Sequence, residues 1–258
     1  MALGIVSSLI ATLLLAAASL VWRNRHNLSL LGTGLSSRSI VRVSCAALLR
    51  VKEDDRYVLI ELSSRPTFFG PPGGVFKYRP DATDDLDAVG FREERYRRRH
   101  DEMVRDVRGF VPARSLVRFV RWFVSGAGRE SAAECLRREL SEELQGHLDR
   151  RTSVDVTQAR FRHLRTVTEG PARVPGQSLR LLRRLEVFDL GVDDEASARV
   201  RHHLVTLGRD PAAVAFLCAT SSEIMAGWCG RSPIAPHAGY LLGGKRLQVD
   251  LPPMPDHG

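Results

Sequence analysis

The spacing of hydrophobic and polar positions predicts two strands early in the chain. Residues 40–51 and 56–62 are apolar and rich in β-branched side chains, and the acidic turn Lys-Glu-Asp-Asp separates them. This pattern predicts a pair of neighbouring strands. The Gly- and Pro-rich stretch 63–78 predicts an ordered loop after the second strand. Strand-like patterns follow at 159–169 and 178–190, whereas 193–207 and at least part of 211–228 have helical patterns.

Residues 131–145 have the strongest helical pattern in the chain. Ala133, Leu136, Leu140 and Leu144 form an apolar stripe at helical spacing, suited to packing on a sheet. The charged stretch 79–129, also mostly helical in pattern, precedes this helix. Strands around a few helices predict a single α/β or α+β domain.

The N-terminal segment 2–22 carries no charged side chain. As a helix it reaches roughly 30 Å, the thickness of a bilayer core, which predicts one transmembrane helix; a cleaved signal peptide is the alternative. Arg23 and Arg25 follow the apolar run, so the rest of the chain is expected in the cytoplasm. The expectation is a single-pass protein of the bacterial inner membrane. The predicted parts are an anchor at 1–24, a linker at 25–39, a domain at 40–250 and a tail at 251–258.

Composition adds a basic surface and no obvious redox chemistry. The net charge is +8, and the surplus is mostly arginine, clustered at 92–100, 113–124 and 180–185. Such a surplus suits phosphate ligands or acidic lipids, and no nucleic-acid-binding motif accompanies it, so no nucleic acid polymer is expected as a partner. The four cysteines form no CxxC pair and are expected to be small apolar residues.

The predicted helix at 131–145 concentrates acids on one face. Glu139, Glu142 and Glu143 fall at positions i, i+3 and i+4, where like charges repel in an isolated helix. A divalent cation among them removes that repulsion, and carboxylate oxygens suit Mg²⁺ or Mn²⁺. Arg138 is placed to pair with Glu130 near the helix start. A solvent-exposed acidic helix balanced by arginine is the alternative.

The string formed by Glu130, Arg138, Glu139, Leu140, Glu142 and Glu143 resembles the second part of the Nudix box, Glu-x7-Arg-Glu-U-x-Glu-Glu, in which U is aliphatic. The segment "FGPPGGVF" resembles the glycine loop that precedes it, with Gly73 and Gly74 as its glycines. The resemblance implies a mixed sheet between helices and Mg²⁺-dependent hydrolysis of a nucleoside diphosphate linkage.

The resemblance also implies roles for single residues. Glu142 and Glu143 would bind metal, and Glu139 would bind metal or orient the attacking water, so that Glu139 and Glu143 are the catalytic candidates. Glu130 would pair with Arg138 or join the metal shell, and the Gly73 carbonyl would add a ligand. All of this requires the loop and the helix to meet in space.

The chain departs from the Nudix pattern in two ways. An insert at about 79–129 separates the glycine loop from Glu130, and Gln145 stands where the box has glycine. A membrane helix, a "GPPGGVFKY" loop, a long basic insert and a split box together resemble the SMODS-associated Nudix proteins of bacterial CBASS antiphage systems. That resemblance implies an effector whose domain senses a cyclic oligonucleotide.

Several other residues are candidates for ligand contact. Lys77 and Arg79 follow the glycines and could meet a phosphate. The aromatic candidates for base stacking are Tyr78, Phe68 and Phe69. The candidates for an acid outside the helix are Glu186, Glu169 and Glu223, and His237 is a candidate for ligand contact or proton transfer. The amphipathic stretch 118–124 either lies on a membrane or packs on the domain.

Three functions follow from these features. The first is a membrane-anchored effector that binds a cyclic or other nucleotide and responds through homo-oligomerisation. The second is a Mg²⁺-dependent Nudix hydrolase. The third is a structural adaptor whose acidic helix binds neither metal nor ligand.

Overall fold

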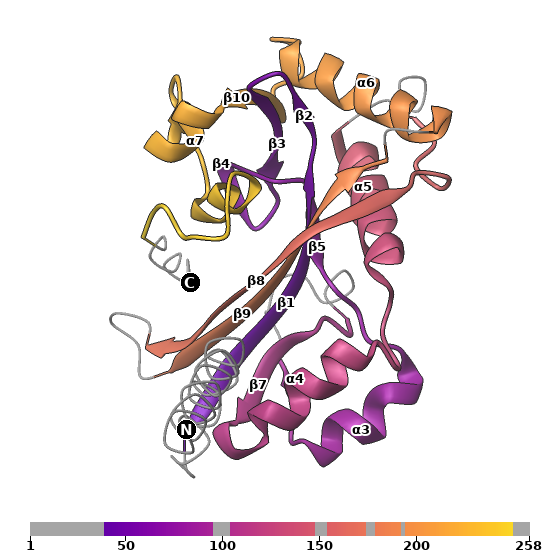
Figure 1. Ribbon diagram of the computed structural model, residues 1–258, viewed down its shortest axis with the longest axis vertical. Helices are drawn as coiled ribbons and strands as arrows, with labels where there is room; N and C mark the ends of the chain where they lie inside the picture. The colour runs from indigo at the N-terminus through magenta and orange to yellow at the C-terminus, as the bar shows by residue number, and fades with distance from the viewer. Residues whose placement is uncertain (1–38, 95–103, 148–153, 174–178, 192–193, 250–258) are drawn as a thin grey trace, which may run out of the picture.

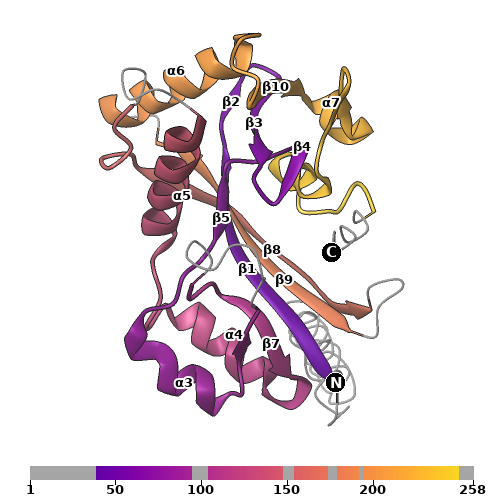
Figure 2. The ribbon, with the colours of Figure 1, turned by 180° about the vertical axis from the view of Figure 1, so that it is seen from behind.

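The protein is described by a computed structural model at residues 39–94, 104–147, 154–173, 179–191 and 194–249. Figures 1 and 2 show a long twisted sheet with helices along one side and a smaller sheet at one end. The larger sheet has the order β6-β7-β1-β9-β8, and β5 also pairs with β1. Its strands are β1 (Ile40–Arg50), β5 (Gly73–Val75), β6 (Arg92–Glu93), β7 (Arg108–Pro112), β8 (Phe161–Arg173) and β9 (Arg180–Leu190).

The smaller sheet has the order β10-β3-β2, with β4 against β3. Its strands are β2 (Lys52–Glu53), β3 (Arg56–Leu62), β4 (Arg65–Gly70) and β10 (Phe216–Thr220), and β11 (Trp228–Cys229) and β12 (Ser232–Pro233) form a separate pair. The helices are α3 (Thr83–Ala88), α4 (Leu116–Ser125), α5 (Ala132–His147), α6 (Glu195–Arg209) and α7 (Ser221–Ala226). Three short 3-10 turns complete the elements: η1 (Pro80–Ala82), η2 (Ala113–Ser115) and η3 (Pro236–Leu241).

The central strand β1 has apolar side chains on both faces. Val41, Val43 and Leu49 lie in one core cluster with residues of α3 to α6, whereas Ala46 and Leu48 lie in a second cluster with residues of α7 and η3. Side chains alternate between the faces of a strand, so a strand covered on both sides must be apolar almost throughout. This explains the continuous apolar run seen in the sequence.

The expected pairing of the first two strands is wrong. β1 pairs with β5, β7 and β9, whereas β3 pairs with β2, β4 and β10 in the smaller sheet. The acidic turn is still a hairpin, but its first strand is the short β2. β1 is drawn instead into the middle of the larger sheet, where both of its apolar faces are covered.

The insert is part of the domain core. β7 lies antiparallel to β1, and Phe119 and Phe123 of α4 are fully buried in the same cluster as β1. α4 ends at Gly126, whose φ of 75° is the left-handed conformation that favours glycine at a helix end. The stretch 118–124 therefore packs on the domain, and the insert combines strands with helices, not mostly helices as its pattern suggested.

The expected fold class needs one correction. A mixed α/β domain is present, but no helix within the described residues has the length and apolar character needed to cross a bilayer. The segment 2–22, expected to form a membrane helix, lies outside the described residues. The described residues therefore show the mixed domain alone.

Candidate functional site

The helix α5 begins with a capping box. The Ser131 N–H donates to Glu134 Oε2 at 2.6 Å, and the Glu134 N–H donates to Ser131 Oγ at 3.2 Å. These two bonds satisfy backbone donors that a helix start leaves without partners. Further along, Leu136, Leu140 and Leu144 are buried against the sheet. The position of the helix start and the position of the apolar stripe together determine which face of α5 carries the glutamates.

The glycine loop and the acidic helix meet in space, although 55 residues lie between Gly74 and Glu130 in the sequence. The Gly73 N–H donates to Glu143 Oε1 at 3.3 Å. A Cβ atom at Gly74 would lie 2.2 Å from the Glu139 carboxyl carbon. Gly73 itself has a φ of +116°, a conformation that L side chains rarely adopt. Both glycines are thus required by the approach of β5 to α5.

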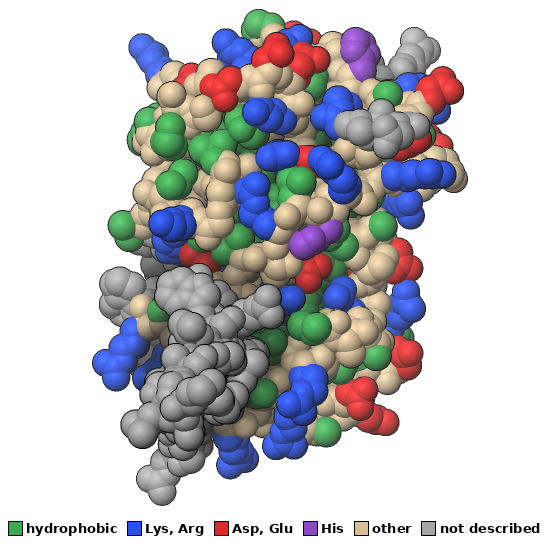
Figure 3. Space-filling view, viewed as in Figure 1, with side chains coloured by type: hydrophobic (Ala, Val, Ile, Leu, Met, Phe, Trp, Pro, Cys, Tyr) green, Lys and Arg blue, Asp and Glu red, His purple; other side chains and the backbone are tan. Residues whose placement is uncertain are grey.

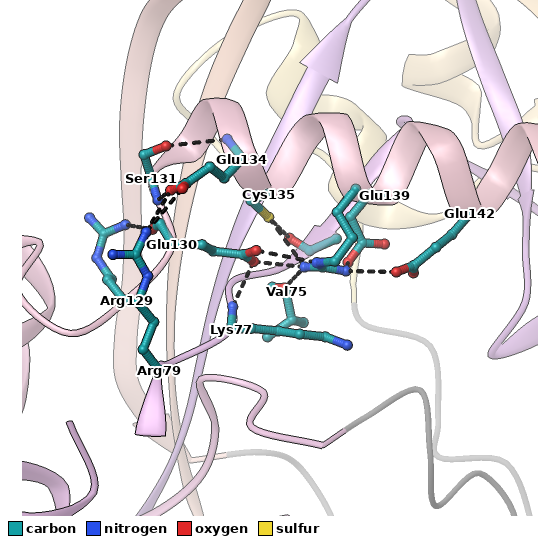
Figure 4. A network of polar contacts seen from close by, with 12 residues as sticks. Val75, Lys77, Arg79, Arg129, Glu130, Ser131, Glu134, Cys135, Glu139 and Glu142 are labelled. Carbon is teal, nitrogen blue, oxygen red and sulfur yellow. Dashed lines mark hydrogen bonds and ion pairs between the residues drawn. The ribbon is translucent and has the colours of Figure 1, made fainter. Parts of the chain in front are cut away.

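Arg138 is the centre of a polar network on α5 (Figure 4). Its Nη2 donates to Glu130 Oε1 at 2.7 Å and to the Val75 carbonyl at 3.0 Å. Its Nη1 lies 2.6 Å from Glu139 Oε1 and 3.5 Å from Glu142 Oε1. The structure therefore brings together Glu130 and Arg138, and one guanidinium contacts three carboxylates, so that negative charge remains in excess.

Burial raises the pKa of two carboxylates on α5, those of Glu143 and Glu139. Loss of solvent raises the pKa of Glu143 well above its ordinary value, and the neighbouring Glu139 raises it further. Loss of solvent also raises the pKa of Glu139, against the opposing effect of Arg138. Glu143 Oε2 is buried with no hydrogen-bond partner among the described residues. A buried carboxylate oxygen of this kind calls for a proton or a cation.

Asp106 is an acid of this site that the sequence reasoning missed. It is 6% exposed, lies within the insert and pairs with Lys77 in an antiparallel bridge. Burial raises its pKa to about 7, with Lys77 among the charges that oppose the shift and Glu139 among those that add to it. The sequence held no signal for this residue, because its place depends on the insert returning beside Lys77.

Lys77 and Arg79, the predicted phosphate contacts, lie beside the network. The Lys77 N–H donates to Glu130 Oε1 at 2.7 Å, so its backbone helps to hold the acid. The Arg79 guanidinium lies 2.9 Å from Glu134, and both side chains are about half exposed. In Figure 4 both residues lie beside α5, on the segment that follows β5.

The three candidate acids outside α5 have ionic or hydrogen-bond partners of their own. Glu169 accepts from Arg246 and Tyr240, and these bonds lower its pKa against the effect of burial. Glu223 closes the capping box of α7, and Glu186 faces Arg184 at 3.7 Å. Glu186 lies on the α5 side of the sheet, because it pairs with Ala47, which in turn pairs with Gly74.

The aromatic candidates and His237 are also spread over the fold. Tyr78 packs edge-on against Phe91, Phe68 lies under the Arg65 guanidinium, and Phe69 is buried in the second core cluster. A Cβ atom added at Gly70 would lie 2.9 Å from His237 Nε2, so this ring packs on β4, away from α5.

The predicted metal set is only partly assembled. In the described part of the chain, no group of three or more His, Cys, Asp or Glu side chains is placed to hold a metal ion. Arg138 lies between Glu139 and Glu142, and Glu142 remains half exposed. The donor chemistry does fit a divalent cation at Glu143, whose Oε2 atom lacks a partner among the described residues, and at Glu139, whose pKa is raised by burial. These two residues are the ones that would hold it.

The glycine loop, the capped acidic helix and the surrounding sheet together decide the family. The SMODS-associated NUDIX domain matches residues 40–242. The chain belongs to the SMODS-associated NUDIX family. The match includes the insert, so the split Nudix box lies inside one domain. No curated protein and no solved structure matches the chain. Nudix domains generally use divalent metals and nucleotide-type ligands, which agrees with the chemistry of the Glu139–Glu143 pair.

Proposed function

We propose that this domain is an antiphage defence effector that binds a nucleotide signal, such as a cyclic oligonucleotide, where β5 meets α5. The family membership supports a nucleotide-type ligand. The glycine loop lies against α5, where the Gly73 N–H donates to Glu143 and the Lys77 N–H to Glu130, and the basic residues Lys77 and Arg79 lie next to it. Basic side chains are among the groups that recognise phosphate.

The contacts of Arg138 carry the choice of binding over hydrolysis. Arg138 engages Glu130, Glu139 and Glu142 at the same time. Carboxylates that are balanced by a guanidinium are poorer ligands for a cation than free ones. A ligand phosphate that draws Arg138 away would expose these acids and change the packing between α5 and β5. Such a change is suited to a sensor.

The response to the ligand is proposed to be a change in oligomeric state. A ligand shifts an equilibrium only through its different affinity for two states, so subunit association must depend on the occupied site. Light scattering of the protein with and without a panel of cyclic di- and trinucleotides measures this directly. If a nucleotide binds and the size of the particle in solution does not change, the proposed nucleotide site is supported and the proposed change in oligomeric state is contradicted.

The binding test uses a matched pair of glycine variants. Gly74→Ala places a methyl group against the Glu139 carboxylate and is expected to abolish binding of the nucleotide panel in calorimetry. Gly244→Ala is the control, because a Cβ atom there meets no atom within 4 Å. Binding that survives in Gly74→Ala would place the nucleotide elsewhere, and a panel that binds neither wild type nor control would contradict the proposal.

Mg²⁺-dependent hydrolysis is the second candidate, and Glu143 favours it. Its buried Oε2 atom, which has no hydrogen-bond partner in the part of the chain that the structure describes, supports this candidate. A bound cation would supply charge stabilisation at a phosphoryl group, while Glu139 would orient water. The candidate predicts product release from dinucleotide, capped or cyclic substrates with Mg²⁺, and loss of that turnover in Glu143→Gln. Equal turnover in both proteins would exclude this site as its source.

A further inference from the structure

A second polar region, which we call the arginine shelf, lies on the sheet face that α4 and α5 cover. Residues paired across neighbouring strands point to the same face, and Arg184 pairs with Cys45 on one side and Thr168 on the other. Cys45 belongs to the core beneath the helices, whereas Thr166 is exposed. The helices therefore leave this edge open. The shelf consists of Arg129, His163, Thr166, Thr168, Arg184 and Glu186.

Surface charge alone does not single out a ligand site on this protein. Figure 3 shows Lys and Arg side chains distributed over the whole visible face, from the end with α6 to the end with α4. Arg184 is different because it is largely buried, with its side chain 20% exposed. Its Nε atom is completely buried, and its guanidinium makes no hydrogen bond within the described residues. Its one ionic contact is Glu186, at 3.7 Å.

Arg129 brings a second guanidinium to the same place. It lies 4.1 Å from the centre of the Phe123 ring, and Arg184 lies 5.8 Å from that ring. Arg129 is anchored there, because its Nε donates to the Phe123 carbonyl and its Nη1 to the Glu130 carbonyl, both at 2.8 Å. Two arginines thus share a half-buried site in which Glu186 is the single carboxylate that the described residues supply. Such a site has more positive charge than its own residues balance.

We propose that Arg184 and Arg129 bind a phosphate group of the nucleotide ligand. This inference rests on the proposed nucleotide binding and adds a second contact point to it. Planar guanidinium groups donate in pairs to phosphate oxygens, and the Thr168 and Thr166 hydroxyls on the neighbouring strand are further donors. Because Arg129 directly precedes Glu130, a ligand with two phosphates could reach the shelf and the α5 acids together.

The test compares two arginines on the same strand pair. Arg184→Gln removes the shelf cation without removing a hydrogen bond. Arg162→Gln is the control, because Arg162 contacts Asp189 on the other face of β8 and β9. Calorimetry of the full chain uses inorganic phosphate and a panel of cyclic dinucleotides as probes. Arg184→Gln is expected to lower the affinity for phosphate and for the nucleotides by about tenfold or more, which is the loss typical of a charged hydrogen bond. The control is expected to bind both probes as wild type does.

The outcomes separate this inference from the proposed function. Nucleotide binding that is equal in wild type and Arg184→Gln would overturn the shelf and leave the proposed function standing. Phosphate binding that depends on Arg184, with no binding of any nucleotide, would retain the shelf and contradict the proposed function. Melting temperatures add an independent readout: phosphate should raise that of wild type and not that of Arg184→Gln. A variant that melts several degrees lower yet binds normally would show a structural role and overturn the inference.

Discussion

The α5 acids and the arginine shelf differ in how their buried charged groups are paired. On α5, the Arg138 guanidinium lies within 3.5 Å of carboxylate oxygens of Glu130, Glu139 and Glu142. On the shelf, Arg184 has one carboxylate at 3.7 Å and a buried Nε atom without a partner. A buried charge that is paired and hydrogen-bonded is tolerated by the fold, whereas one that is not costs free energy unless something else binds it. The carboxylates of the protein itself thus hold Arg138, whereas Arg184 is the residue that we propose as an anion contact.

Substitution of the two arginines should separate the regions most strongly. Arg138→Ala leaves Glu130 and Glu139 without their cation and is expected to lower the free energy of unfolding by about 3–5 kcal/mol. Arg184→Ala should cost far less, because it breaks no hydrogen bond. Urea denaturation measures both. Similar losses would show that Arg184 is as structural as Arg138, and exposed Arg121→Ala is the surface control.

The pH dependence of stability in an Asp106 variant tests the region of the α5 acids. Its pKa in the folded protein is about 7, above its ordinary value of 3.8, so folding favours the protonated form. The associated stability is present below pH 4 and is lost as pH rises through 7. Asp106→Asn should remove this loss and be more stable than wild type at pH 8 by about 2 kcal/mol. Thermal unfolding from pH 4 to 8, with exposed Asp81→Asn alongside, measures it; parallel curves for wild type and Asp106→Asn would contradict the raised pKa.

Glu143→Gln sharpens the comparison by asking whether the acid region also needs a ligand. Glutamine can still accept from the Gly73 N–H, and it removes a carboxylate whose pKa is raised by burial. Without added metal, the variant should gain roughly 1–2 kcal/mol of stability at neutral pH. Mg²⁺ should then raise the melting temperature of wild type and not of the variant. A rise in both proteins would place the cation elsewhere.

The smallest effect is expected at the rim of the acid region. The Arg79–Glu134 pair is about half exposed, and exposed pairs contribute about 0–1 kcal/mol. Arg79→Ala should therefore leave stability nearly unchanged, while a ligand phosphate at the glycine loop should bind more weakly. Calorimetry with the nucleotide panel decides this, and unchanged affinity would remove Arg79 from the ligand site.

Local patterns in the sequence were enough to predict the helix α5, the strands β8 and β9, the acids on one helical face, and the resemblance to the family that the 40–242 match shows. These features depend on residues a few positions apart, where helical and strand spacing act directly. The prediction of a membrane helix before the domain found no support in the described residues. The predicted metal ligands, ligand-binding residues and location of the protein stay predictions.

Only the tertiary structure decided which distant segments meet. It placed β1 beside β9 and not beside β3, returned the insert to the core, and brought Asp106 to Lys77. It also left Arg184 with a single ionic contact among the described residues, to Glu186 at 3.7 Å, although the sequence shows three arginines within 180–184 that look alike. The physical reason is that strand partners and the burial of a charge depend on contacts between residues far apart in the chain. Residue type and spacing determine which groups a side chain is able to bind. The fold determines whether partners within the protein already occupy that side chain.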